Sequence, residues 1–136
     1  MLKKIIGLGI IGIAILLIVG ITLSYYSIKE SPSDSKMIIE ADVIMPTKVS
    51  RPGCEEIDRC YIPSVIEIEK GKKVTWINED SAFHSVTSGF YDSPTDLFDS
   101  GYLDPFESYT LVFDETGVYD YFCTLHPWMK GKVIVG

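Results

Sequence analysis

The feature that most constrains the fold is a series of short β-like runs after Met37, where no stretch shows a sustained helical repeat. The runs are rich in β-branched and aromatic residues and are bounded by turn residues. In one of them, 64–69, isoleucines alternate with glutamates, and Lys70-Gly71 supplies a turn into the next run. The expected strands are 37–45, 64–69, 72–78, 84–87, 109–113, 118–123 and 132–135. Short strands with turn signals every ~8 to 12 residues predict an all-β fold, a β-sandwich.

A second feature lies before this domain. Residues 5–23 form a 19-residue run without charge, and a helix of that length, at ~1.5 Å per residue, spans a hydrocarbon core of ~30 Å. Lys3 and Lys4 precede the run and stay inside by the positive-inside rule. The segment after Leu23 is a poor cleavage site, so a retained transmembrane helix is favoured over a long cleaved signal peptide, which stays open. The sequence predicts a cytoplasmic segment 1–4, an anchor 5–23, a polar linker 24–36 and a domain 37–136 on the extracytoplasmic face of the cell membrane.

The charge of the exterior part limits its partners. Two of the 12 Lys and Arg residues lie in the first four positions, which leaves 10 against all 19 Asp and Glu, a net charge of −9. Nucleic acid and anionic lipid both require a basic surface, so this balance argues against them. A protein partner with a basic docking patch fits better. An equally good interpretation is that the negative charge only keeps the domain soluble.

The strongest chemical pattern lies near the C-terminus, where Cys123, His126 and Met129 recur at every third residue, at the end of a strand and in the loop after it. That spacing lets the three side chains converge on one point. Together they are a soft donor set, and a trigonal copper site with a weak axial Met needs one further His. The chain offers only His84. Zinc competes for Cys and His, but Met is a poor ligand for it. Two histidines exclude a polynuclear copper centre and a three-His zinc site.

Four segments carry a resemblance to a known family. They are His84-Ser85-Val86-Thr87-Ser88-Gly89, Phe98-Asp99-Ser100-Gly101, Gly117-Val118-Tyr119-Asp120-Tyr121-Phe122-Cys123 and His126-Pro127-Trp128-Met129-Lys130-Gly131-Lys132-Val133. On these residues the domain resembles the small blue (type 1) copper cupredoxins of the plastocyanin/amicyanin kind. The resemblance implies a Greek-key sandwich that holds one copper ion, Cu(I) or Cu(II), at one end. It also implies that His84, Cys123 and His126 lie near one plane with Met129 axial.

The resemblance further implies routes for electrons. The family exposes the edge of its second His within an apolar patch, so His126 is expected to be the main electron port. Leu125, Pro127 and Trp128 surround it in the sequence. Phe122, next to Cys123, resembles an aromatic residue used as a second port.

Two other expectations concern the surroundings of the ligands. Ser85 resembles a residue that ties the two ligand loops together and whose amide donates to the Cys sulfur, and such bonds tune a metal site. Strand alternation places Tyr119 and Tyr121 on the face of Cys123, where we expect them to fill the core, and it turns Phe122 to the other face.

The sequence departs from the family at two places. A Pro-Gly turn is expected after Leu103, but Phe106 stands where the glycine would be, which leaves the position of that turn open. The second departure is the pair Cys54 and Cys60. In an oxidising compartment two cysteines so close together form a disulfide that closes a short loop; a second metal site or free thiols are the alternatives.

Two classes of function remain. The first is a membrane-anchored one-electron carrier between redox protein partners, which is not an enzyme. The second is a small copper oxidoreductase, in which an open axial position admits a small molecule such as a nitrogen oxide. Met129 distinguishes them, because a bound thioether closes the site. Copper storage or delivery is less favoured, because Met129 is the one methionine with a clear ligand context.

Overall fold

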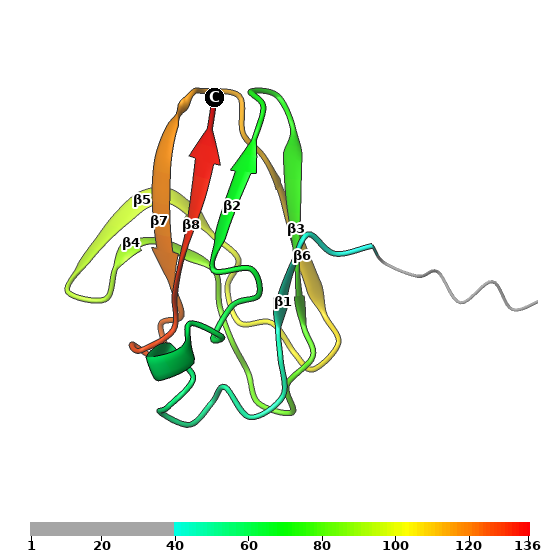
Figure 1. Cartoon of the computed structure of the whole chain (residues 1–136), viewed down its shortest axis with the longest axis vertical. Coiled ribbons are helices and arrows are strands. Elements are labelled where there is room, and N and C mark those ends of the chain that lie inside the picture. The colour runs from blue at the N-terminus through cyan, green and yellow to red at the C-terminus, as the bar shows by residue number, and fades with distance from the viewer. Residues whose placement is uncertain (1–39) are drawn as a thin grey trace, which may run out of the picture. The chain divides into compact units, whose positions relative to one another are not determined.

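Two β-sheets make up residues 40–136, the part of the chain that the structure, a computed structural model, describes (Figure 1). The strands are β1 (Val43–Met45), β2 (Val65–Ile68), β3 (Lys73–Asn78), β4 (Thr87–Phe90), β5 (Ser93–Asp99), β6 (Ser108–Val112), β7 (Gly117–Phe122) and β8 (Lys130–Val135). One sheet has the order β1-β3-β6 and the other β2-β8-β7-β4-β5. The predicted all-β sandwich is therefore confirmed.

The strand pairing holds the end of β7 from both sides. β1 pairs with β3 and β2 with β8 in parallel, and the other neighbours are antiparallel. β7 lies between β8 and β4, and its last residue, Phe122, faces Lys130 on one side and Thr87 on the other. Cys123 follows directly, so its backbone leaves the sheet from a doubly paired position.

Aromatic side chains join the two sheets. Trp76 of β3 and Tyr121 of β7 are both buried, and their rings meet edge to face with centroids 5.5 Å apart. Tyr61 packs against Tyr121 in the same way at 4.9 Å. Tyr119 packs against this core as a partly buried residue, whereas Phe122 is not part of it. The predicted alternation along β7 is thus confirmed.

Two predicted strands begin later than expected. The run 84–87 is not a strand, and β4 begins only at Thr87. His84 makes a single bridge to Leu103, because the next amide, that of Ser85, donates to a sulfur atom and not to a neighbouring strand. In the run 37–45 the structure has strand only from Val43, among the residues it describes.

β5 (Ser93–Asp99) was not predicted at all. It contains Pro94, which lacks an amide hydrogen. Most of its side chains are exposed, so its sequence lacks the alternation of buried and exposed residues by which a strand is recognised. Its place at the edge of the five-stranded sheet explains both features, because an edge strand tolerates proline. By contrast, the predicted Lys70-Gly71 turn is present: Gly71 has a left-handed φ of 82°, which glycine adopts at no steric cost.

Helix is almost absent from the described residues. Residues 40–136 contain the short 3-10 turn η1 (Glu55–Ile57) and no helix long and apolar enough to cross a membrane. The predicted anchor 5–23 and linker 24–36 lie outside the described residues.

The contact between Tyr121 and Gly131 gives a test of the packing. Gly131 is the cross-strand partner of Tyr121, and a Cβ atom placed on it would overlap the tyrosine ring. We expect Gly131→Ala to lower the free energy of unfolding by ~1–3 kcal/mol, as overpacking of a core does. Chemical denaturation of the full chain measures this. Gly117→Ala, also in a strand but with only ordinary contacts, is the control and should leave the free energy of unfolding unchanged. Equal stability of the two variants would contradict the described packing of Tyr121 on Gly131.

Candidate metal centre

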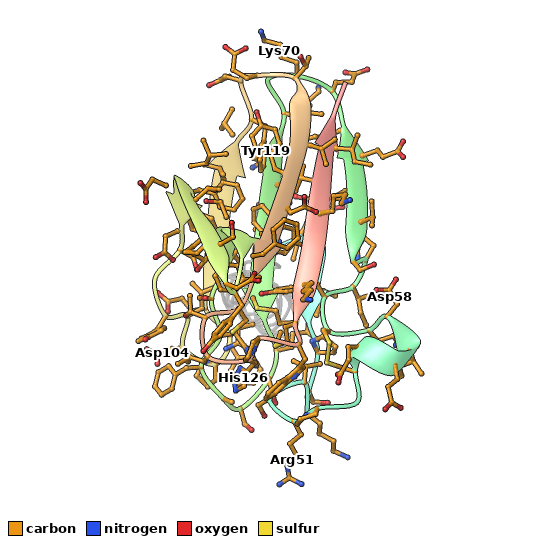
Figure 2. All side chains as sticks on the ribbon, turned by 90° about the vertical axis from the view of Figure 1, so that its left-hand side faces the viewer. Arg51, Asp58, Lys70, Asp104, Tyr119 and His126 are labelled. Atoms are coloured by element: carbon orange, nitrogen blue, oxygen red, sulfur yellow. A yellow bond between two sulfur atoms is a disulfide. The ribbon has the colours of Figure 1, made fainter. Side chains whose placement is uncertain are left out.

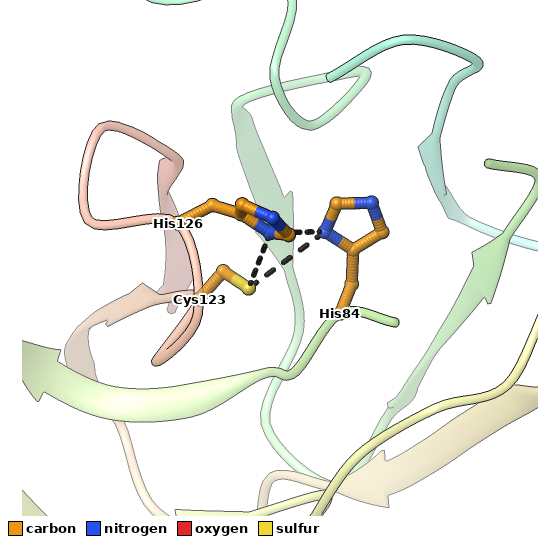
Figure 3. A group of neighbouring side chains, drawn as sticks. All are labelled: His84, Cys123 and His126. Carbon is orange, nitrogen blue, oxygen red and sulfur yellow. Dashed lines mark hydrogen bonds between the residues drawn. The ribbon is translucent and has the colours of Figure 1, made fainter. Parts of the chain in front are cut away.

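Three donor atoms converge at one end of the sandwich (Figure 3). His84 comes from the loop between β3 and β4, and Cys123 and His126 come from the loop between β7 and β8. The two Nδ1 atoms are 3.1 Å apart, and Cys123 Sγ lies 3.7 Å from that of His84 and 3.5 Å from that of His126. Figure 2 shows His126 at the end of the domain opposite to Lys70.

The size of this triangle fits a metal ion. The three distances between the donor atoms define a triangle with a circumradius of about 2.0 Å. One point therefore lies about 2.0 Å from all three donor atoms. Bonds from zinc, a first-row metal of similar size, to imidazole nitrogen and thiolate sulfur are ~2.0–2.1 Å and ~2.3 Å long. The three side chains can therefore hold one such ion without rearrangement.

A buried carboxylate determines which nitrogen of His84 faces the site. Asp80 Oδ2 lies 3.1 Å from His84 Nε2. Burial by itself would raise the pKa of the Asp80 carboxyl, but hydrogen bonds from the Lys48 amide, the His84 imidazole and the amides of Ser81 and Ser50 outweigh it and hold that pKa well below its usual range. An ionised carboxylate only accepts hydrogen bonds, so Nε2 of His84 carries the ring proton and Nδ1 keeps its lone pair.

Both imidazoles are neutral at neutral pH. Burial lowers the pKa of His84 and also that of His126, although Asp80 opposes the shift in each case. Two ring nitrogens and a sulfur then direct electron pairs into the same small volume. A soft cation satisfies all three donors at once.

Met129 belongs to the same loop and is completely buried. The loop is compact: the Met129 amide donates to the His126 carbonyl at 2.8 Å, and the Cys123 amide donates to the Met129 carbonyl at 3.2 Å. Pro127 follows His126 in this loop and contributes no amide hydrogen. The backbone thus keeps the thioether residue beside the other donors.

Ser85 connects the two ligand loops. Its amide donates to Cys123 Sγ at 3.3 Å, and its hydroxyl accepts a hydrogen bond from the Thr124 amide at 2.9 Å. The sulfur therefore has a hydrogen bond from the loop that carries the first histidine. Sequence reasoning expected Ser85 here but missed Thr124, which has no motif of its own.

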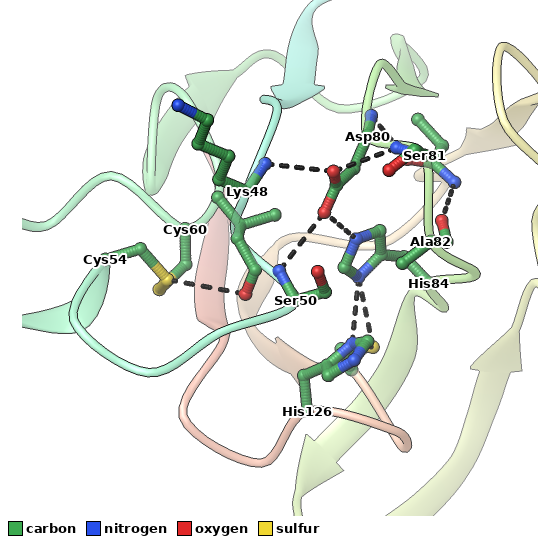
Figure 4. Close-up of polar contacts among 12 residues, drawn as sticks. Lys48, Ser50, Cys54, Cys60, Asp80, Ser81, Ala82, His84 and His126 are labelled. Carbon is green, nitrogen blue, oxygen red and sulfur yellow. Dashed lines mark hydrogen bonds and ion pairs between the residues drawn. A yellow bond between two sulfur atoms is a disulfide. The ribbon is translucent and has the colours of Figure 1, made fainter.

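Residues 46–63, which we call the strap, touch both ligand loops (Figure 4). On one loop, the amides of Lys48 and Ser50 donate to the Asp80 carboxylate. On the other loop, the indole Nε1 of Trp128 donates to the Val49 carbonyl at 3.0 Å. Sequence reasoning singled out this segment for its cysteines but did not connect it to the site.

The two cysteines of the strap form the predicted disulfide. The sulfurs of Cys54 and Cys60 are bonded, and the carbonyl of Trp128, next to Met129, lies 3.9 Å from Cys60 Sγ. Tyr61 follows Cys60, and its hydroxyl donates to the Ser85 carbonyl at 2.6 Å. Cys123 is the free cysteine of the chain, and it is buried.

Of the aromatic residues expected at the two electron ports, Trp128 lies beside His126 and Phe122 lies under the surface. The rings of Trp128 and His126 have centroids 5.3 Å apart. Phe122 is only 3% exposed, and Tyr91 from the turn between β4 and β5 packs edge to face against its ring. The use of Phe122 as a second port stays a prediction, and an electron on this route would have to pass Tyr91, which comes from a hairpin that sequence reasoning did not find.

The turn after Leu103 exists despite the missing glycine. The Glu107 amide donates to the Asp104 carbonyl, and Phe106 takes the left-handed φ of 67° that a glycine would adopt. Phe106 is 74% exposed, so packing does not explain why a bulky residue is held in this conformation. An unfavourable conformation with an exposed side chain directs attention to function.

Comparison with known proteins agrees with this site. The model of the copper binding proteins of the plastocyanin/azurin family matches residues 52–136. Amicyanin of Paracoccus versutus is 32% identical over 117 residues, 86% of this chain and 86% of the relative. Plastocyanin of Scenedesmus fuscus is 36% identical over 83 residues, 55% of this chain and 85% of the relative. The solved structure of a novel purple cupredoxin from Nitrosopumilus maritimus has a TM-score of 0.64 and 35% identity, and covers 71% of this chain and 100% of its own.

Fold, donor set and relatives together define a mononuclear copper protein on a cupredoxin-like sandwich. The chain belongs to the plastocyanin/azurin family of copper-binding proteins. Copper is the metal of the centre, and its type 1 site comprises His84, Cys123, His126 and Met129.

Copper binding has a direct optical test. Addition of one equivalent of Cu(II) to the full chain should produce intense visible absorption, because a thiolate bound to Cu(II) gives strong charge transfer. Cys123→Ser should abolish that absorption, whereas the matched replacement of both Cys54 and Cys60 by Ser should retain it. A colourless Cu(II) complex, together with equally tight binding of zinc by the protein, would contradict the type 1 assignment.

Proposed function

We propose that the protein is a one-electron carrier between redox protein partners, tethered to the cell membrane with its copper domain on the extracytoplasmic face. The observation that carries the proposal is the donor triangle, which already has the dimensions of a metal site. Bound copper supplies the Cu(II)/Cu(I) couple. The chain supplies a frame whose shape changes little when one electron is gained or lost.

The rigidity of that frame has identifiable sources. The Ser85 amide holds the Cys123 sulfur, the Asp80 carboxylate holds the His84 ring, and the carbonyl of His126 accepts from the Met129 amide. Each bond comes from a backbone or buried group that has little freedom of its own. Fixed ligands need little reorganisation during electron transfer, which favours a carrier.

The proposed contact surface for a partner surrounds His126. Leu125 precedes it and is exposed, Phe83 precedes the ligand His84 and is exposed, and Phe106 projects from the neighbouring turn. The loops that carry these residues are linked, since His84 bridges Leu103 and the Phe106 amide donates to the Asn78 carbonyl. An apolar surface at an electron port permits close and short-lived contact with a partner.

A second route is available through β7. Phe122 is adjacent to Cys123, and Tyr91, which is 57% exposed, stands over it with ring centroids 6.2 Å apart. Asp92 follows Tyr91, and Asp120, which pairs with Lys132, stands two residues before Phe122. We therefore propose Tyr91, rather than Phe122, as the exposed end of this route, and a basic patch on the partner that docks there.

The competing function, small-molecule chemistry at an open copper site, has less support. Met129 is completely buried and its amide is bonded into the ligand loop, so the thioether has little room to leave. Tethering rests on the uncharged run 5–23 and on Lys3 and Lys4 before it. The Cys54–Cys60 disulfide fits a domain that works in an oxidising compartment.

Met129 provides the test between carrier and open site. Met129→Leu should retain the visible colour of the full chain and raise the reduction potential, because loss of a thioether donor weakens binding of Cu(II) more than that of Cu(I). Voltammetry and optical titration measure both quantities. If spectrum and potential are unchanged, Met129 is not a ligand and the open-site function gains.

Phe106 provides the test of the contact surface. Phe106→Gly removes an aromatic contact and relieves a left-handed conformation that costs roughly 1–2 kcal/mol for a non-glycine residue. We expect electron self-exchange between Cu(I) and Cu(II) forms to slow several-fold, with equal or greater stability and an unchanged potential. Leu97→Ala, which alters an equally exposed apolar residue on β5, is the control. Equal rates for wild type and Phe106→Gly would count against this surface.

A further inference from the structure

Asp80 is a buried carboxylate without a cationic side chain to balance it. It is 2% exposed. The ion pairs among residues 40–136 are Lys70 with Glu115, Lys132 with Asp120, and Asp80 with the neutral ligand His84. A buried charge is unfavourable unless hydrogen bonds or an opposite charge compensate it. Retention of a carboxylate in this position therefore calls for a role.

Hydrogen bonds use both oxygens of this carboxylate. Oδ1 accepts from the amides of Lys48 and Ser81, at 2.9 and 2.8 Å. Oδ2 accepts from the Ser50 amide and from His84 Nε2, both at 3.1 Å. Three of the four donors are backbone amides, which fix the orientation of the carboxylate. The carboxylate in turn determines the orientation of the His84 imidazole.

The strap is shaped to hold this anion. Lys48 has a left-handed φ of 75°, a conformation that turns nearby amides toward a common point. Such concave groups of backbone N–H donors bind anions. The strap is in turn attached to the other ligand loop through Trp128. One carboxylate thus links the strap to the first copper ligand.

We propose that Asp80 is a positioning residue that fixes the tautomer and orientation of His84 and, by its charge, favours the oxidised over the reduced copper site. This inference rests on the copper site, and its effect on potential serves the proposed electron carrier. Carboxylate–imidazole pairs of this kind raise the basicity of a metal-bound histidine.

Charge explains the direction of the effect. With one thiolate and two neutral imidazoles, the oxidised site carries one net positive charge and the reduced site none. The Asp80 carboxylate is one imidazole ring away, in an interior where interactions between charges are stronger than in water. It therefore attracts the oxidised site more, and its removal should shift the balance toward Cu(I).

The test compares two substitutions that remove the same formal charge from adjacent residues. Asp80→Asn removes the buried carboxylate and Glu79→Gln an exposed one. In the full chain we expect Asp80→Asn to weaken Cu(II) binding relative to Cu(I) at least tenfold, the lower end for a lost partner of a metal ligand. Tenfold corresponds to about 59 mV for one electron, measured as a rise in reduction potential. Glu79→Gln should change the ratio of Cu(II) affinity to Cu(I) affinity less than twofold.

A second measurement needs no variant. In the diamagnetic Cu(I) form of the wild type, NMR should place the Nε2 proton of His84 downfield of the Nε2 proton of His126, because the His84 proton is donated to a carboxylate. Equal chemical shifts of the two protons, or equal potentials for Asp80→Asn and Glu79→Gln, would overturn the inference. These results are separate from the proposed electron carrier, which fails if the wild-type chain has no reversible one-electron couple. If Asp80→Asn does not fold, the NMR measurement still decides.

Discussion

The structure depends on the convergence of three electron-pair donors that repel one another when no cation is present. Nδ1 of His84, Nδ1 of His126 and Sγ of Cys123 lie within 3.1 to 3.7 Å of one another. Such an arrangement persists only if the surrounding chain holds each donor separately. The doubly paired end of β7 holds the cysteine, the compact loop holds the second histidine, and Asp80 holds the first. The sandwich thus serves as a rigid support for a cluster that its own side chains do not favour.

The strap extends this support beyond the two sheets. Its amides reach Asp80, its Val49 carbonyl accepts from Trp128, and Tyr61 reaches the Ser85 carbonyl. Both ligand loops are therefore attached to a third segment as well as to each other. Movement of one loop relative to the other would break hydrogen bonds in several places, so the geometry of the site is determined cooperatively.

Much of the site could be predicted from the sequence because most of its ligands are neighbours in the chain. Cys123, His126 and Met129 share one loop, and only one other histidine was available to complete the set. Asp80 could not be predicted, since its role requires amides from a segment 30 residues or more away. The same holds for the burial of Phe122, against whose ring Tyr91 packs. The strand β5 was missed because an exposed edge strand with a proline lacks the alternation that reveals a strand.

The disulfide of the strap has a consequence for the choice of metal. A chain in which all three cysteines are reduced offers three thiolates to soft ions. Once Cys54 and Cys60 are joined, Cys123 is the one thiolate left in the chain. Oxidation of the strap thus leaves the copper ion one sulfur anion to bind, at the same time as it closes the segment whose amides hold Asp80 in place.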